Sequence, residues 1–146
     1  MMVPFVDIVD GEPDDHDTDR LLEILLEYNA PWTAHIAEKP HLAILLRKEE
    51  RGEVIGGLYA RDEYNWLFIK YLVVPQEFRG MGLGSQLMRH AEAIARERGY
   101  LGLFLDTFEF QARPFYEKLG FEVFGSLEGD QETPARFLLK KRLAAT

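Results

Sequence analysis

Hydrophobic residues recur at helical spacing in the middle of the chain. From Leu83 onward the apolar positions lie three or four residues apart, with polar residues between them. This period gathers the apolar side chains on one face of a helix. Gly99 follows two arginines, and a glycine after basic residues is typical of a helix C-terminus. The pattern predicts a helix that ends near Gly99, with an apolar stripe of Leu83, Leu87, Met88, Ala91, Ile94 and Ala95.

Short apolar runs between turn residues predict strands. The first covers Val3 to Val9, and residues 41–74 are expected to form an antiparallel meander of three strands joined by the turns KEERGE and DEYN. Residues 101–107 form another strand. The segments FEVFGSLE and ARFLLKKRL are expected to close the chain as a hairpin.

Three further helices are expected from capping and breaker residues. Asp17 or Thr18 is placed to cap the first, and Pro114 fits only the first turn of the last. The expected ranges are Asp19 to Asn29, Pro31 to Glu38, and 111–120 with Gly120 as its end.

The resulting order, β-α-α-β-β-β-α-β-α-β-β, predicts an α/β (α+β) fold. We expect a mixed, mostly antiparallel sheet of about seven strands with helices on both faces. The helix after Leu83 joins the fourth and fifth strands, which should be parallel because such a crossover returns to the same end of the sheet. A chain of 146 residues, 47% of them hydrophobic, suits a single domain over residues 1–146.

The composition excludes several classes of function. The 25 acidic and 17 basic residues give a net charge of -8, which argues against a nucleic-acid partner. The chain has no cysteine, and its four histidines lack metal-ligand spacing, so we expect no metal. It begins with no signal-peptide pattern and contains no apolar run of ~18 residues, so we expect no membrane partner and a cytoplasmic location.

Three glycines at alternate positions, Gly80, Gly82 and Gly84, lie between a predicted strand and the long helix. The first N–H groups of a helix have no intrahelical partner, and the helix dipole favours an anion there. A Walker loop needs Gly-Lys-Ser/Thr, but Gln86 follows Ser85 here. The dinucleotide pattern G-x-G-x-x-G also fails at Ser85.

The segment from Arg79 to Gly84 instead resembles the pyrophosphate loop of the GNAT N-acetyltransferase superfamily, Arg/Gln-x-x-Gly-x-Gly/Ala. The upstream YLVVP and the downstream FYEKLGF, Phe115 to Phe121, stand in the order and at the spacing of that family. The resemblance covers nearly the whole chain. It implies a GNAT fold in which the fourth and fifth strands splay apart, and acetyl-CoA as the cofactor.

The resemblance also implies which residues hold acetyl-CoA. The backbone of the glycine turn should bind the pyrophosphate, while the Arg79 side chain either joins this site or is a solvated loop charge. The backbone of the fourth strand should pair with the pantetheine arm, and a backbone N–H near Val73 should bind the thioester oxygen. The implied cofactor residues are Leu72, Val73, Val74, Arg79, Gly80, Met81, Gly82, Leu83, Gly84, Ser85, Thr107, Gln111, Phe115 and Tyr116.

Tyr116 matches the family's usual general acid. A phenol with an ordinary pKa near 10 is protonated at neutral pH and can donate to the leaving sulfur; the alternative role is that of a half-buried aromatic. Many members carry asparagine seven residues earlier, where this chain has Glu109, and Gln111 or Thr107 is placed to substitute for it. The general base stays open among Asp106, Glu109, Glu63, Tyr71 and a water relay, and Asp106 alternatively caps the following helix.

The resemblance makes Trp32 and His35 candidates for the acceptor site, with packing or a surface position as the alternative role. Glu63 and Tyr71 are candidates for the same site because they lie near the ends of predicted strands. The acidic balance favours a small cationic amine as acceptor. Two alternatives remain: a protein N-terminal or lysine acetyltransferase, and a sensor that binds acetyl-CoA without turnover. A homodimer is compatible with the resemblance, since family members are often dimers.

Overall fold

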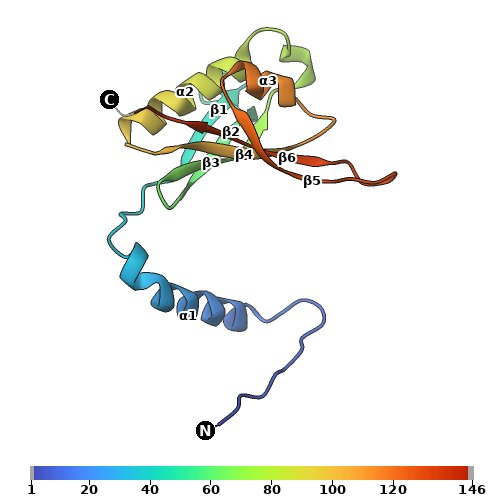
Figure 1. The fold of residues 1–146 in the computed structure, drawn as a ribbon. Coiled ribbons are helices and arrows are strands. Elements are labelled where there is room, and N and C mark those ends of the chain that lie inside the picture. The colour runs from blue at the N-terminus through green and yellow to red at the C-terminus, as the bar shows by residue number, and fades with distance from the viewer. Residues whose placement is uncertain (1, 145–146) are drawn as a thin grey trace. The chain divides into compact units, whose positions relative to one another are not determined.

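The computed structural model describes residues 2–144 (Figure 1). The chain divides into two compact units, the first ending at Ala37 and the second beginning at Glu38. Each unit is described by itself.

The first unit contains one helix, α1, at Asp15–Thr33. Its start differs from the prediction, because the Asp14 side chain accepts a hydrogen bond from the His16 N–H at 2.8 Å and caps the helix earlier. The expected second helix at 31–38 is wrong, since Pro31 lies inside α1, near its end. The strand expected at Val3–Val9 is also wrong, because these residues adopt no regular secondary structure.

Residues 1–37 hold the whole net charge of the protein. They contain nine acidic residues and one basic residue, Arg20, which accounts for the chain's net charge of -8. The remaining residues therefore contain equal numbers of acidic and basic side chains. The acidic excess is a property of this segment, and it says nothing about the chemistry of the second unit.

The second unit is a six-stranded sheet in the order β1-β2-β3-β4-β6-β5. The predicted meander, the crossover helix and the closing hairpin are all present. The sheet has six strands instead of about seven because the first predicted strand is absent. The elements are β1 (Leu42–Arg47), β2 (Val54–Glu63), β3 (Trp66–Val73), a 3-10 turn η1 (Gln76–Phe78), α2 (Leu83–Glu97), β4 (Gly102–Phe108), α3 (Arg113–Lys118), β5 (Glu122–Leu127) and β6 (Arg136–Arg142).

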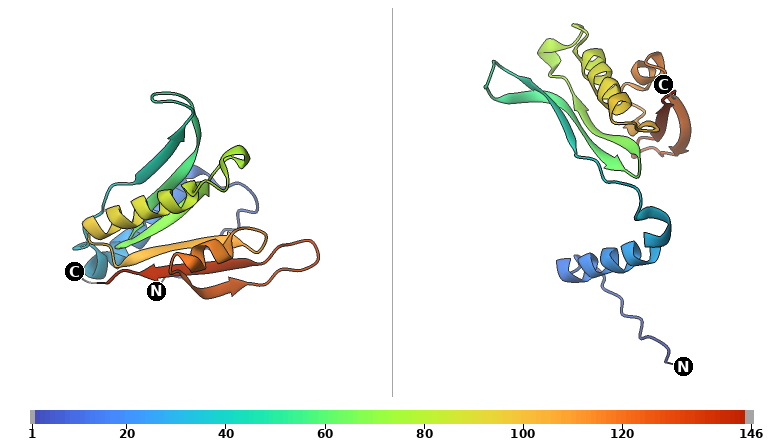
Figure 2. Two further views of the ribbon diagram at one scale, coloured as in Figure 1. Left: turned by 90° about the horizontal axis from the view of Figure 1, so that it is seen from above. Right: turned by 90° about the vertical axis from the view of Figure 1, so that its left-hand side faces the viewer.

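Only β3 and β4 run parallel, as the crossover predicted; the other neighbours are antiparallel. Figures 1 and 2 show α2 and α3 on the same face of this sheet. We call it the covered face; it includes Leu103, Leu105 and Leu139. The opposite face, which no helix of residues 38–144 covers, is called the open face. It includes Phe104, Asp106 and Arg136, because successive strand residues point to opposite sides.

The core lies between the covered face and the two helices. Ala91 and Ala95 of α2 are fully buried, and these small side chains let the helix approach the sheet closely. Each buried leucine contributes about 1.5–3 kcal/mol of transfer free energy. The core side chains with the least exposure are Leu58, Ala60, Leu67, Ala91, Ala95, Leu103, Leu105 and Leu139.

Candidate active site

A cleft opens where β3 and β4 separate. The two strands pair only from Trp66 opposite Gly102 to Phe68 opposite Phe104. Both strands continue beyond this point, so their C-terminal ends diverge, which confirms the predicted splay. The cleft has a volume of about 1210 Å³. Its walls come from β3, the glycine turn, the end of β4 and the start of α3.

One wall of the cleft is backbone. Leu72 and Val73 pair with β2 through one edge of β3. The other edge, beyond Phe68, has no strand partner among the described residues. An unpaired strand edge presents a row of N–H and C=O groups that an extended ligand can pair with.

The glycine turn ends at an uncapped helix N-terminus. Gly82 is the N-cap of α2 with φ 77°, a left-handed conformation that glycine adopts without strain. It has no side chain to cap the helix, and the first intrahelical bond runs from the Gln86 N–H to the Gly82 carbonyl at 3.0 Å. The N–H groups of Leu83, Gly84 and Ser85 precede that bond. They therefore form a site for an anion, reinforced by the helix dipole.

Two contacts fix the turn against its surroundings. The Arg79 Nε donates to the Val74 carbonyl at 3.1 Å, so this side chain ties the turn to the end of β3. A Cβ on Gly84 would lie 3.2 Å from Cζ of Phe115, so the first turn of α2 packs closely against α3. The Arg79 guanidinium is therefore held by one hydrogen bond, and its place in the pyrophosphate site stays a prediction.

Tyr116 lies on α3 and reaches the same cleft. Its ring packs edge-on against Phe115 at 5.1 Å and Phe121 at 6.0 Å between centroids. Burial raises the pKa of Tyr116 to about 12, because the phenolate is poorly solvated there. The hydroxyl therefore keeps its proton through the whole physiological pH range.

The end of β4 carries two hydrogen-bonded pairs, one for each face of the sheet. Buried Thr107 donates to the Gln111 Oε1 at 3.1 Å, so these two candidate substitutes for asparagine bind each other. On the open face, Asp106 accepts from the Arg136 guanidinium at 3.1 Å. Asp106 does not cap α3, whose N-cap is Ala112.

Most of the residues predicted for the cofactor share this one cleft. Of the predicted cofactor residues only Met81 does not line it; Met81 is mostly exposed. Among the other candidates in the second unit, Asp106 and Tyr71 also line it, whereas Glu109 and Glu63 do not.

The register explains why Glu63 is remote. It pairs with Trp66, at the end of the sheet where β3 and β4 are still hydrogen-bonded, and it forms an ion pair with Arg61 at 2.8 Å. Glu109 is exposed just after β4. Trp32 and His35 belong to the first unit, so their role beside the acceptor stays a prediction.

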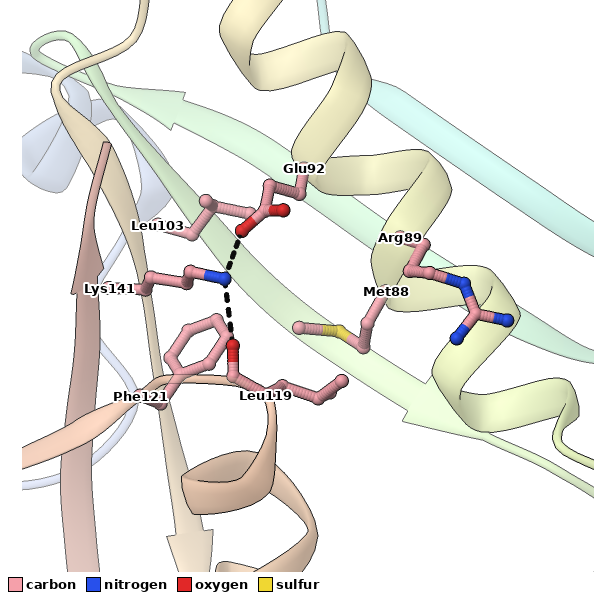
Figure 3. A pocket seen from close by; sticks show the side chains of 7 residues that line it. All are labelled: Met88, Arg89, Glu92, Leu103, Leu119, Phe121 and Lys141. Atoms are coloured by element: carbon pink, nitrogen blue, oxygen red, sulfur yellow. Dashed lines mark hydrogen bonds and ion pairs between the residues drawn. The ribbon is translucent and has the colours of Figure 1, made fainter. Parts of the chain in front are cut away.

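Two features near the site are not predicted by the sequence patterns. The aromatic residues Phe108 and Phe110 line the cleft, and their alternation at the end of a strand was the available signal. The second feature is Lys141, whose ammonium lies between the Glu92 carboxylate at 2.5 Å and the Leu119 carbonyl at 2.8 Å (Figure 3). These partners are far apart in sequence, so no local pattern reveals the contact.

Lys141 connects three elements around Tyr116. It extends from β6, Glu92 belongs to α2, and Leu119 ends α3. The Leu119 N–H in turn donates to the Tyr116 carbonyl at 3.0 Å. The lysine therefore holds the end of the short helix that carries the buried phenol.

Within residues 2–144, no cluster of histidine, aspartate and glutamate has the geometry to hold a metal ion. None of the helices in that range combines the length and apolar character that crossing a membrane requires.

Comparisons with known proteins place this geometry in a family. The model of the acetyltransferase (GNAT) family matches residues 6–121. A blasticidin-S acetyltransferase from Streptomyces morookaense is 40% identical over 95 residues, covering 64% of this chain and 70% of the relative. The acetyltransferase Atu2258 from Agrobacterium fabrum is 37% identical over 91 residues, covering 62% and 66%.

The fold agrees with these matches. A solved acetyltransferase from Bacillus cereus superposes with a TM-score of 0.81 at 28% identity, over 93% of this chain and 98% of that one. Because the family model matches most of this chain and the splayed cleft is present, the chain belongs to the GNAT acetyltransferase family.

Proposed function

We propose that this protein transfers an acetyl group from acetyl-CoA to a primary amine of a small molecule by direct attack in a ternary complex. One observation carries the proposal: a buried, protonated phenol, Tyr116, faces the same cleft as the uncapped N-terminus of α2. An anion site and an acid within one cleft suit a donor with a diphosphate at one end and a thioester at the other.

The residues present fit acetyl-CoA. A Cβ on Gly82 would meet no atom within 4 Å, so the space in front of this glycine is free for a phosphate. The unpaired edge of β3 offers the backbone groups that an extended pantetheine arm needs. The residues that would hold the cofactor are the backbone of 80–85, the edge of β3 near Val73, and Gln111, whose amide nitrogen stays available once its oxygen binds Thr107.

The chain's own residues make two contributions to the reaction. Acetyl-CoA provides a thioester whose carbonyl carbon accepts the amine and whose sulfur leaves. A backbone N–H on the free edge of β3 stabilises the negative charge that develops on the carbonyl oxygen. Tyr116 donates its proton to the departing sulfur, and the buried aromatic contacts hold the phenol in place.

The proton that leaves the amine is not assigned to a side chain. Asp106 is already bound to Arg136, and Tyr71 is largely exposed on β3. Water in the cleft is the proton acceptor most consistent with this arrangement.

The acceptor is proposed to be a small molecule, which the name of the Streptomyces relative supports. The preference for a cation stays a prediction, since the acidic excess that suggested it lies in residues 1–37. Within the second unit, Asp106 lines the cleft but is bound to Arg136, while Asp62, Glu63 and Glu109 do not line it.

The test is release of free CoA from acetyl-CoA with a panel of amines. We expect turnover with at least one amine, and Tyr116→Phe should lower kcat about 100-fold while acetyl-CoA still raises the melting temperature. Tyr100→Phe is the matched control, because Tyr100 is another buried tyrosine whose pKa is raised by burial but which does not line the cleft.

Two outcomes would contradict the proposal. If millimolar acetyl-CoA does not shift the melting temperature, acetyl-CoA is not the donor. Tight acetyl-CoA binding with no turnover on any amine would favour the sensor alternative.

A further inference from the structure

Two phenylalanines form a parallel stack at the mouth of the cleft. The rings of Phe108 and Phe110 are 5.3 Å apart between centroids with an interplanar angle of 9°. Both line the cleft, yet the Phe110 side chain is 71% exposed. A stacked ring that leaves so much of its surface open offers a flat apolar surface to another ring.

The turn that carries this stack is fixed by hydrogen bonds. The Gln111 Oε1 accepts from the Phe108 N–H at 2.8 Å, and the Gln111 N–H donates to the Phe108 carbonyl at 2.9 Å. The N–H of Glu109, the residue between the two phenylalanines in the sequence, donates to the Ala135 carbonyl at 2.9 Å. The rings therefore sit on a defined turn, and a ligand that stacks there need not order it first.

A cation also supports the stack. The Arg136 guanidinium lies 5.8 Å from the centroid of Phe108 and is held there by Asp106. This places a bound arginine and two stacked rings together beside the cleft.

Phe108 lies on the face of the sheet opposite the proposed anion site. It shares the open face with Asp106, while Leu105 and Thr107, which alternate with them along β4, are buried on the covered face. The uncapped end of α2, the proposed anion site, belongs to a helix on the covered face. With the donor on that side, the amine is expected to approach from the open face, beside Phe108 and its stacking partner Phe110.

We propose that Phe108 and Phe110 bind the aromatic ring of the acceptor, so that the preferred acceptors are amines carried on a short arm by a planar aromatic or heteroaromatic ring. This inference rests on the proposed function and narrows its acceptor class. The physical reason is that a planar ring extends the parallel stack with offset contacts over its whole face, whereas a puckered saturated ring touches Phe110 through only part of its surface.

Benzylamine and cyclohexylmethylamine test this, because they share the aminomethyl group and differ in the planarity of the ring. The measured quantity is the ratio of kcat/KM for benzylamine to kcat/KM for cyclohexylmethylamine. The two amines differ in basicity, but this difference affects the ratio equally in every variant. The decisive comparison is therefore how the ratio changes from one variant to another. We expect the ratio to fall about tenfold in Phe110→Leu, in keeping with what one stacking contact contributes.

Two variants serve as controls. Phe110→Tyr keeps the ring and should keep the wild-type ratio. Phe124→Leu changes another half-exposed phenylalanine, on β5 beneath Lys140 and outside the cleft, and should also leave the ratio unchanged.

An unchanged ratio in Phe110→Leu overturns the inference. So does a rise in KM for acetyl-CoA with an unchanged amine ratio, because that result assigns Phe110 to the donor. Failure of the proposed function is distinguishable from both, since it appears as no CoA release with any amine of the panel. Turnover with other panel amines but not with benzylamine also overturns the inference.

Discussion

The two faces of the sheet in the second unit are built from the same strands but differ in character. On β4, Leu103 and Leu105 on the covered face are at most 2% exposed, and they pack beneath α2. Between them, Phe104 on the open face stacks on Phe68 at 4.9 Å and stays partly exposed. The covered face supplies stability and holds the helix that follows the glycine turn. The open face contributes ion pairs and aromatic contacts of smaller energy, and no helix of residues 38–144 covers it.

The largest expected difference between the faces is in stability. Leu103→Ala should lower the free energy of unfolding by about 2–5 kcal/mol, because it leaves a cavity in a closed core. Phe104→Ala, the next residue on the same strand, should cost less than half as much, since its ring is not enclosed. Urea denaturation of both variants measures this, and equal losses would mean that the open face is as tightly packed as the covered one.

The donor site is expected at one end of α2 only. Gly82 and Gly99 have the same φ of 77°, and a Cβ on either would meet no atom within 4 Å. Glutamate at either position should therefore cost similar stability, about 1–2 kcal/mol of left-handed strain. Only Gly82→Glu should weaken acetyl-CoA binding, by about 100-fold, because its carboxylate repels the pyrophosphate. Calorimetric titration of both variants would contradict the site if their affinities fell equally.

The buried phenol should make stability depend on alkaline pH. Tyr116 has a pKa of about 12 in the folded protein, above the ordinary value near 10. The unfolded chain therefore loses this proton first, and the contribution to stability is present below pH 10 and is lost as the pH rises toward 12. A two-unit shift corresponds to about 1.4 kcal/mol lost at pH 11. Denaturation of wild-type protein and Tyr116→Phe between pH 8 and pH 11 should show this difference; parallel pH profiles would show that the phenol is not buried.

Neighbouring lysines on β6 give the smallest and most local test. Lys141 on the covered face binds Glu92 and Leu119, whereas Lys140 on the open face lies over Phe124 at 5.5 Å. Lys141→Met should lower kcat about fivefold with little change in KM for acetyl-CoA, because α3 and Tyr116 lose a support (a loss of about 1 kcal/mol). Lys140→Met should change neither kcat nor KM for acetyl-CoA.

A double-mutant cycle separates positioning from general destabilisation. In a Tyr116→Phe background, Lys141→Met should have almost no further effect on kcat, since the phenol it positions is absent. A full fivefold loss in that background would show that Lys141 acts elsewhere.

Local sequence signals predicted the parts of the site that depend on neighbours along the chain. The glycine turn, the helix from Leu83 and the segment that carries Tyr116 all lie within short stretches whose spacing specifies them. The same signals placed the end of α2 before Gly99 and the hairpin of β5 and β6. They failed at Pro31, which lies within the last turn of α1 although a proline there removes a backbone donor. They also gave Glu63 as a site residue, because a strand's sequence does not reveal which of its ends lies at the splay.

The sequence by itself determined the family, and it predicted the donor loop and the acid, because each prediction follows from residue types at fixed local spacing. Only the tertiary structure decided what each side chain meets. Asp106 is bound by Arg136, 30 residues away, and Lys141 reaches Glu92 on another element. The stack of Phe108 on Phe110 likewise depends on how the turn after β4 closes. Contacts of this kind arise when strands take their register and helices pack on one face, and no local period encodes that choice.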